Sequence, residues 1–462
     1  MSLITSISGL RGTIGGTPGE NLTPLDAVKF TAAFVDLLKQ THQTKLKIVV
    51  GRDARISGLA LKNQIISTLQ FCGADVVDLD LATTPTVEIM VTRTKAQGGI
   101  ILTASHNPKE WNALKLLNDK GEFISATDGA KLLELASQQN FDFASIEELG
   151  QVKIVSDALE FHIDKILELP LVNQKLIAEA NFSVAIDGIN SVGGTAIPQL
   201  LKALGVKNIY ELNCEPNGDF AHNPEPLAEH LTDISALVKN KKADLGIVVD
   251  PDVDRLAFID ENGDMFGEEY TLVAVADYIL ENYQDSEYNK STVSNLSSSR
   301  ALKDVAIKHQ ATYEAAAVGE VNVVTKMKEI KAIIGGEGNG GIIYPELHYG
   351  RDALVGVALF LTFLAQQKIT VSALRAKYPS YVMIKHKLTL TDRAEINTIF
   401  DKLKSAYPNQ PMDEQDGLKI EWADAWAHIR PSNTEAIMRL YIEAPDEAKS
   451  QALLTEILAK IK

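Results

Sequence analysis

Three aspartates form the strongest chemical signal in the sequence. Asp250, Asp252 and Asp254 lie within five residues in the stretch VVDPDVDRLAFID. Carboxylates this close repel one another unless a cation compensates their charge, and Mg2+ commonly binds through a few carboxylates and a phosphate oxygen. Arg255 follows directly and is a candidate for a second phosphate oxygen. The triplet therefore predicts a divalent-metal site, although a solvated acidic loop stays open as an alternative.

An EF-hand is the competing metal site, because Glu261 stands twelve residues into a loop that begins at Asp250. Such a loop needs glycine at its sixth position for the sharp turn, and Arg255 stands there. The strand-like flanks also disagree with the two helices of an EF-hand. We therefore disfavour this reading.

A serine follows an apolar run in GGIILTASHNPKEWNALK, residues 98–115. As a phosphoserine, Ser105 would be a phosphoryl donor when a metal neutralises the transferred group. The G-x-S-x-G elbow of acyl-transfer hydrolases is absent there. Lys115 and Arg11 are candidates for positioning charge or moving protons. A turn or cap role for Ser105, and surface salt bridges for Lys115 and Arg11, are the alternatives.

Two further loops suit a phosphorylated sugar. In GGEGNGG, residues 335–341, Glu337 and Asn339 offer a carboxylate and an amide to hydroxyl groups, and the P-loop lysine is missing. The stretch RPSNTEAIMR combines arginine with hydroxyls and turn amides, which together make a phosphate cradle. Its candidate residues are Arg430, Ser432, Asn433, Thr434 and Arg439. An ordinary glycine-rich turn and a capped turn are the alternatives.

Composition restricts the class of protein. The 462 residues suffice for two to four domains, and a net charge of -16 disfavours nonspecific binding to nucleic acid or anionic membranes. Cys72 and Cys214 are too few and too distant for a disulfide framework. The first residues lack a signal-peptide pattern, and the apolar run from Ala353 to Ala365 fits a buried helix. We expect a cytoplasmic protein without nucleic-acid or membrane partners.

Three segments repeat the order of strand, polar loop, helix and strand, beginning at Leu46, Phe182 and Ser291. This order predicts three similar α/β domains, with ligand-binding loops after the carboxyl ends of their strands. The chain then changes to an α+β pattern. The expected domains are residues 1–150 with the serine loop, 151–256 with the metal loop, 257–370 with the sugar loop and 371–462 with the phosphate loop.

These motifs, in this order, resemble the α-D-phosphohexomutase family, which includes phosphoglucomutases, phosphomannomutases and phosphoglucosamine mutases. The resemblance runs from Ser8 in SGLRG to the RPSNTEA stretch at Arg430, and TASHNP and DPDVDR are its most specific motifs. It implies an α/β protein with three similar domains of mixed sheets and a smaller C-terminal α+β domain around a central cleft.

By this resemblance, Ser105 is the phosphoserine and binds Mg2+ together with Asp250, Asp252 and Asp254. Glu337 and Asn339 would contact the sugar, and the loop from Arg430 to Thr434 would hold the phosphate that is not transferred. Lys115 matches a lysine of the family's active-site loop, and Arg11 matches the arginine of its N-terminal motif.

The implied reaction interconverts hexose 6-phosphate and hexose 1-phosphate. A hexose bisphosphate is the intermediate and the activator, and it turns round in the cleft before returning a phosphoryl group to Ser105. Many members have serine for Asn339, histidine for Gly341 and proline for Ala436. The Asn-Gly-Gly version resembles a branch that includes phosphoglucosamine mutases and phosphoglucomutase-like members, and we modestly favour glucosamine phosphate over glucose or mannose phosphate.

Two other functions stay open: a non-catalytic, metal-dependent phosphosugar-binding protein and a phosphatase. The only partner expected is a phosphosugar, and the chain would be a monomer or a homodimer.

Overall fold

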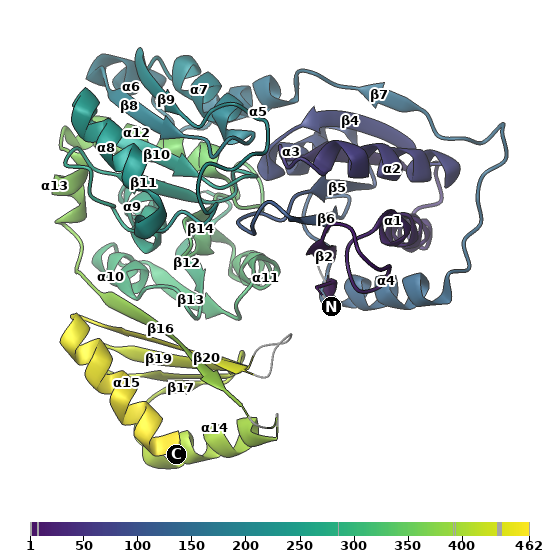
Figure 1. Cartoon of the computed structure of the whole chain (residues 1–462). Helices are drawn as coiled ribbons and strands as arrows, with labels where there is room; N and C mark the ends of the chain where they lie inside the picture. Colours follow the sequence, from purple (N-terminus) through teal and green to yellow (C-terminus); the bar gives the residue numbers. More distant parts are fainter. Residues whose placement is uncertain are drawn as a thin grey trace. The chain divides into compact units, whose positions relative to one another are not determined.

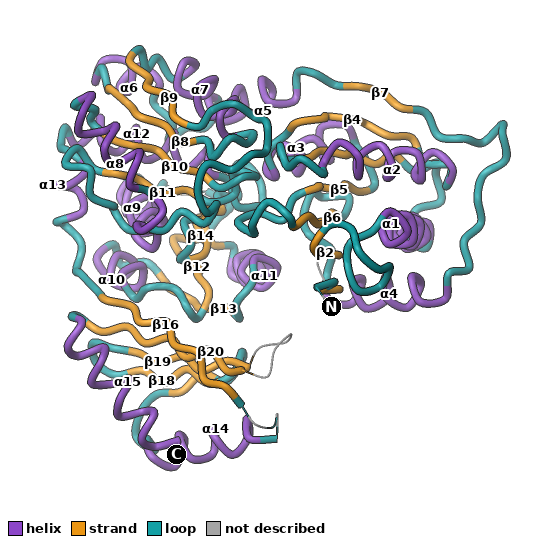
Figure 2. The backbone as a smooth tube through the Cα atoms, viewed as in Figure 1, coloured by secondary structure: helices purple, strands orange, loops and turns teal. Residues whose placement is uncertain are grey.

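The computed structural model describes residues 2–6, 9–284, 286–390, 392, 394–431 and 437–461 (Figures 1 and 2). The chain divides into two compact units. Unit 1 comprises Met1–Thr271 and Asn339–Ser372, and unit 2 comprises Leu272–Gly338 and Ala373–Lys462.

The first sheet of unit 1 surrounds the strand that leads into the serine loop. Its order is β1-β2-β6-β5-β3-β4-β7, with parallel pairs around β3 and antiparallel pairs around β6, so the sheet is mixed. The strands are β1 Ile4–Ser6, β2 Gly9–Thr13, β3 Lys47–Arg52, β4 Asp75–Leu81, β5 Gly98–Leu102, β6 Trp111–Leu117 and β7 Val152–Ile154.

Helices cover both faces of this sheet because its central strands are apolar on both sides. In β3, Ile48 and Val50 belong to one hydrophobic cluster and Val49 to another, as the two-residue period of a strand requires. The first cluster lies under α1 Pro24–Lys39, α2 Gly58–Phe71 and α4 Ala126–Gln138. The second lies under α3 Thr84–Thr94 and α5 Ala158–Leu167. Strand β5, which leads into the serine loop, is buried throughout.

The second sheet carries the metal loop. Its order is β11-β10-β8-β9, from β8 Ser183–Asp187, β9 Asn208–Leu212, β10 Leu245–Val249 and β11 Leu256–Ile259. Helices α6 Gln174–Ala180, α7 Gly193–Ala203 and α8 Thr232–Lys241 accompany it. Strands β10 and β11 are antiparallel and buried, and the loop Asp250–Arg255 joins them. The strand after the metal loop therefore belongs to the second sheet, and the predicted domain limits stay predictions.

The remaining elements of unit 1 include β15 Gly341–Ile343 and the buried helix α12 Ala353–Gln367. Every residue from Ala353 to Ala365 is buried, which confirms the prediction of a buried helix there. Phe360 of α12 stacks on Phe258 of β11 with ring centroids 3.8 Å apart, and Phe266 meets both rings edge-on. Among the described residues, no helix is long and apolar enough to cross a bilayer.

Unit 2 contains a third sheet, in which β12 Asn289–Asn295 pairs in parallel with β13 Thr312–Ala316 and β14 Ala332–Glu337. Helices α10 Ala301–Lys308 and α11 Glu320–Ile330 accompany these strands. Helices α9 Glu268–Glu281 and α13 Val371–Arg375 lie where the two units join along the chain.

The C-terminal part of unit 2 is an antiparallel sheet of order β16-β20-β19-β18-β17. Its elements are β16 Val382–Thr389, α14 Glu395–Ala406, β17 Met412–Asp413, β18 Leu418–Glu421, β19 Trp426–Pro431, β20 Ile437–Ala444 and α15 Glu447–Ile461. The predicted fold class, with three α/β sheets and an antiparallel C-terminal domain, is confirmed. A central cleft stays a prediction.

Phe360→Ala tests the packing between α12 and the second sheet. Removing a buried aromatic ring leaves a cavity, so we expect unfolding to become easier by about 3–5 kcal/mol. The urea midpoint of the protein, followed by circular dichroism, measures this. Phe143→Ala is the control, because Phe143 is 54% exposed and its loss should leave the midpoint almost unchanged. Equal midpoints for Phe360→Ala and the parent protein would contradict this account.

Candidate active site

Ser105 and the aspartate triplet meet inside unit 1. Ser105 is buried, and its Oγ donates a hydrogen bond of 2.6 Å to Oδ2 of Asp250, 145 residues away in the chain. The backbone of Ser105 is left-handed, with φ of 48°, which is uncommon for a residue with a side chain. Its amide donates to Oγ1 of Thr103 at 2.9 Å, which helps to hold this conformation. The structure thus brings together the two strongest motifs of the sequence.

The metal loop is folded around Asp250. Oδ1 of Asp250 accepts hydrogen bonds from the amides of Asp254 and Arg255, each at 3.1 Å. Val253 at the tip of the loop has a φ of 62°, so the chain turns sharply between β10 and β11. All three aspartates are fully buried, and one carboxylate oxygen from each lies within 4.8 Å of the others. This concentration of negative charge is what a hard cation would compensate.

Two oxygens of the triplet are left over for such a cation. Oδ1 of Asp252 and Oδ1 of Asp254 are buried and accept no hydrogen bond from any residue that the structure describes. Burial and then the charges of Asp252 and Asp254 raise the pKa of Asp250 well above its usual value. Buried carboxylate oxygens without partners are costly in a folded protein. The residues therefore fit a divalent metal ion.

Lys115 projects from β6 between two of the aspartates. Its Nζ donates to Oδ2 of Asp252 at 2.7 Å and to Oδ2 of Asp254 at 3.3 Å. Burial alone would lower the pKa of Lys115, but the two carboxylates raise it above its usual value. Lys115 therefore stays protonated at neutral pH in this arrangement. Of the two roles considered for it, positioning charge fits this geometry better than moving a proton.

Two more side chains donate hydrogen bonds to the Oδ2 atoms of Asp252 and Asp254. Oγ1 of Thr84, at the start of α3, donates to Oδ2 of Asp252 at 2.7 Å. Nη2 of Arg351, eight residues beyond β15, donates to Oδ2 of Asp254 at 2.7 Å. Because these hydrogen bonds restrict the rotation of both carboxylates, Oδ1 of Asp252 and Oδ1 of Asp254 keep a fixed direction.

A second cluster of charge is positive and lies around His106. Its Nδ1 is 3.5 Å from Oγ of Ser105. Burial, followed by the charges of Arg255, Arg11 and Arg351, lowers the pKa of His106 to about 2. The imidazole is therefore neutral among three guanidinium groups. A phosphate group is the natural anion for such surroundings.

The two predicted arginines of this cluster each contact another side chain among the described residues. Nη1 of Arg11 donates to Oδ1 of Asn107 at 2.9 Å, which attaches β2 to the serine loop. Arg255 has Glu225 as its ion-pair partner at 3.8 Å. Both guanidinium groups thus keep charge available beside Ser105.

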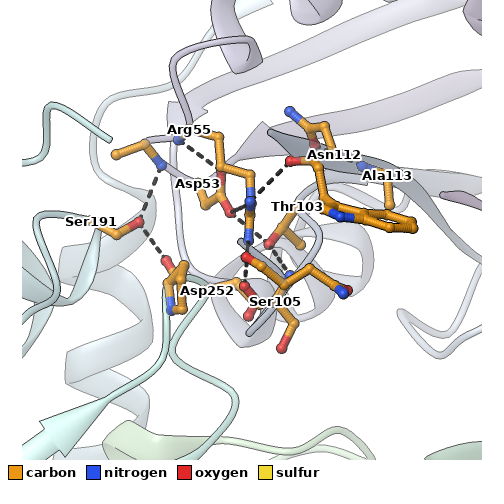
Figure 3. A network of polar contacts seen from close by, with 12 residues as sticks. Asp53, Arg55, Thr103, Ser105, Asn112, Ala113, Ser191 and Asp252 are labelled. Atoms are coloured by element: carbon orange, nitrogen blue, oxygen red, sulfur yellow. Dashed lines mark hydrogen bonds and ion pairs between the residues drawn. The ribbon is translucent and has the colours of Figure 1, made fainter. Parts of the chain in front are cut away.

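Sequence reasoning missed Asp53, Arg55, Thr103 and Ser191 (Figure 3). Asp53 and Arg55 lie in GRDARISG directly after β3, a stretch treated only as a polar loop. Both side chains are fully buried and form an ion pair of 3.0 Å. An aspartate and an arginine two residues apart at the carboxyl end of a buried strand were the available signal.

The other predicted residues lie outside this cluster. Glu337, at the end of β14 in unit 2, is buried and its Oε1 accepts from Asn295 Nδ2 at 2.8 Å. In unit 1, Oδ1 of Asn339 accepts the amide of Gly341 at 3.2 Å. Each therefore has a local structural partner.

The predicted phosphate loop belongs to unit 2. Arg430 of β19 forms an ion pair of 2.7 Å with Asp416 and lies opposite Arg439 of β20. The two guanidinium groups come from directly paired positions, so they leave the same face of the sheet. Ser432, Asn433 and Thr434 lie outside the described residues.

Four domain families of phosphoglucomutases and phosphomannomutases match the chain in order. Three α/β/α domains match residues 3–142, 160–263 and 267–381, and the C-terminal domain matches residues 386–460. The chain is 35% identical to a phosphoglucomutase/phosphomannomutase of Thermococcus kodakarensis over 96% of each chain. It is 30% identical to a phosphoglucosamine/phosphogalactosamine mutase of Sulfurisphaera tokodaii over 99% of this chain and 98% of that one.

A solved structure shares the whole fold. It is a phosphoglucomutase/phosphomannomutase family protein from Burkholderia thailandensis, with a TM-score of 0.85 and 24% identity over 99% of this chain and 97% of that one. The ordered match of all four domains, together with the 35% identity over nearly the full length, shows the relationship. The chain therefore belongs to the phosphoglucomutase/phosphomannomutase family and is a phosphohexomutase.

Proposed function

We propose that Ser105 carries the phosphoryl group in this phosphohexomutase and that Asp250, Asp252 and Asp254 hold Mg2+ beside it. The observation that carries this proposal is the 2.6 Å hydrogen bond between Oγ of Ser105 and Oδ2 of Asp250. Next to it lie the two buried carboxylate oxygens that accept no hydrogen bond from the described residues. A bound Mg2+ would neutralise charge on the transferred phosphoryl oxygens.

Three further residues around Ser105 would position positive charge or bind phosphoryl oxygens. Lys115 is held by Asp252 and Asp254, so its positive charge lies at the edge of the metal site. Arg11 and Arg255 would bind the phosphoryl oxygens that face away from the metal, because their charges gather around His106 beside Ser105. With these groups fixed before the reaction, little reorganisation is needed in the transition state.

The substrate is a hexose phosphate that is phosphorylated at position 1 or 6. Phosphorylated Ser105 would donate its phosphoryl group to the free hydroxyl of the substrate. The resulting bisphosphate would then return its other phosphoryl group to Ser105. Glu337 and Asn339 are the proposed sugar contacts. Arg430, Ser432, Asn433, Thr434 and Arg439 are the proposed contacts of the second phosphate.

Glucosamine phosphate is the proposed sugar. The Asn-Gly-Gly sequence after Glu337 supports it, as does the relative of Sulfurisphaera tokodaii, which is named for amino sugars. A carboxylate such as Glu337 is also a suitable partner for the ammonium group of glucosamine. Glucose or mannose phosphate is the second candidate, because the 35% identical relative is named a phosphoglucomutase/phosphomannomutase.

Ser105→Ala tests the phosphoryl carrier. The variant loses the oxygen that accepts the phosphoryl group, so we expect turnover to fall by at least about a thousandfold with the fold retained. Interconversion of the 1- and 6-phosphates and circular dichroism measure the two properties. Phosphate release in the parent protein is recorded alongside, since hydrolysis above isomerisation would indicate a phosphatase. Undiminished turnover in Ser105→Ala would refute the assignment.

A side-by-side assay tests the sugar. With Mg2+ and a hexose bisphosphate activator present, we expect kcat/KM for glucosamine 6-phosphate to exceed those for glucose and mannose 6-phosphates. Charge pairing with the ammonium group is the physical reason. Equal values for all three sugars, or a higher value for glucose or mannose, would remove the amino-sugar preference and leave the reaction type intact.

Asp252→Asn tests the metal site. Mg2+ at about one hundred times its dissociation constant should stabilise the parent protein by about 2.7 kcal/mol, because it binds the folded state. The variant loses a ligand charge and should lose this response in thermal unfolding. Asp187→Asn is the control, since Asp187 is also buried but accepts a hydrogen bond from Asn213 and pairs with His222 instead. Full stabilisation of Asp252→Asn by Mg2+ would contradict the proposed ligand set.

A further inference from the structure

The serine loop comprises residues 103–110, between β5 and β6. The segment Asp53–Ala54–Arg55 contacts this loop through one guanidinium group. Arg55 is fully buried, and its Nη1 and Nη2 donate four hydrogen bonds, three to backbone carbonyls of the loop and one to that of the first residue of β6. The acceptors are Ser105 at 2.6 Å, Asn107 at 2.6 Å, Pro108 at 2.7 Å and Trp111 at 2.9 Å. The planar fork of arginine can fix several carbonyls at once, which lysine cannot do.

Asp53 reaches the same loop by a second route. Its Oδ2 accepts from Nε of Arg55 at 3.0 Å and from Oγ1 of Thr103 at 2.7 Å. Oγ1 of Thr103 in turn accepts the amide of Ser105. The carbonyl and the amide of Ser105 are therefore both bound, one to Arg55 and the other through Thr103 to Asp53 (Figure 3).

The same segment contacts the metal loop through Ser191, which precedes α7 in the second sheet's domain. The amide of Ala54 donates to Oγ of Ser191 at 3.2 Å. Oγ of Ser191 donates to the carbonyl of Pro251 at 2.6 Å, between Asp250 and Asp252. Ser191 is fully buried, so neither bond competes with water. One hydroxyl thus joins the Asp53–Arg55 segment to the backbone of the metal loop.

Residues near Phe220 also contact the Asp53–Arg55 segment. The Phe220 ring lies over the Arg55 guanidinium, with its centroid 4.9 Å from Cζ. Gly218 approaches so closely that a Cβ there would be 2.0 Å from the carbonyl oxygen of Ala54. Residues 218–220 therefore pack directly against the Asp53–Arg55 segment.

We propose that Asp53, Arg55 and Ser191 set the position of the serine loop relative to the metal loop, and that they are positioning residues for phosphoryl transfer. This inference rests on the proposed roles of Ser105 and the aspartates. The physical reason is that the two loops come from different sheets, so the distance between Oγ of Ser105 and Oδ2 of Asp250 depends on what lies between them. A misplacement of about 1 Å can cost about a hundredfold in rate.

Ser191→Ala tests the link to the metal loop. It removes the hydroxyl that bonds both Ala54 and Pro251, so we expect kcat to fall about 10- to 100-fold with KM within about twofold. The rate at which a hexose bisphosphate phosphorylates Ser105, followed by intact-protein mass spectrometry, should fall by the same factor. A purely structural role would lower the melting temperature without this separation of kcat from KM.

Thr362→Val is the matched control. The hydroxyl of Thr362 is also buried, donates to the carbonyl of Ala358 at 2.8 Å and accepts the amide of Asn173 at 3.2 Å. Its removal costs a similar pair of hydrogen bonds, one within α12 and one from the residue before α6, outside the proposed linkage. We expect a similar loss of melting temperature with kcat unchanged. Equal kcat for the Ser191→Ala and Thr362→Val variants would overturn the proposal.

Arg55→Lys tests the link to the serine loop, with Arg93→Lys of the same domain as control. Lysine keeps the charge beside Asp53 but cannot bind four carbonyls, so kcat should fall while KM holds. Because both residues act through one segment, the effects of Ser191→Ala and Arg55→Lys should be less than additive. Full additivity would overturn the proposal. Turnover that survives Ser105→Ala would instead refute the proposed function, so the two failures are distinguishable.

Discussion

The mutual repulsion of three buried carboxylates is the constraint on which the site depends. Asp250, Asp252 and Asp254 are held together by a sharp turn between two buried strands. Oδ2 of Asp252 and Oδ2 of Asp254 accept hydrogen bonds from Lys115, Thr84 and Arg351, which come from three other parts of unit 1. The first sheet, the start of α3 and the chain after β15 therefore converge on one loop. Oδ1 of Asp252 and Oδ1 of Asp254 accept no hydrogen bond from the residues that the structure describes, which matches the demand of a divalent cation.

The serine loop depends on a different kind of support. Ser105 has a strained left-handed backbone, and its carbonyl and amide are both bound by buried groups. The metal loop that Ser105 contacts carries three buried carboxylates, and the charges of Arg255, Arg11 and Arg351 act on His106, the next residue in the chain. Arg351 also binds Asp254, so the two groups of charge are in contact. Charges of both signs held near Ser105 are suited to stabilising charge that moves between two oxygens.

Much of the fold follows from local sequence. In β3, alternating Ile48, Val49 and Val50 cover both faces, which indicates a buried strand with helices on each side. The apolar run at Ala353 is a fully buried helix, as expected. The predicted domain limits stay predictions; the metal loop joins β10 and β11, two paired strands of one sheet. The contacts of Glu337 and Arg430 within unit 2 could not be derived from their motifs, because partners such as Asn295 and Asp416 are remote in the chain.

The sequence by itself determined the chemistry of the motifs: three carboxylates for a cation, a serine after a buried strand, and a family whose members share them in the same order. The tertiary structure decided how they act on one another. Oγ of Ser105 meets Asp250 across 145 residues, and Lys115 stays charged because Asp252 and Asp254 surround it. In the sequence, Arg55 resembles an ordinary loop residue. Only the structure shows its hydrogen bonds to four backbone carbonyls. Such contacts depend on how sheets pack, and packing is set by many residues together, which no single stretch of sequence contains.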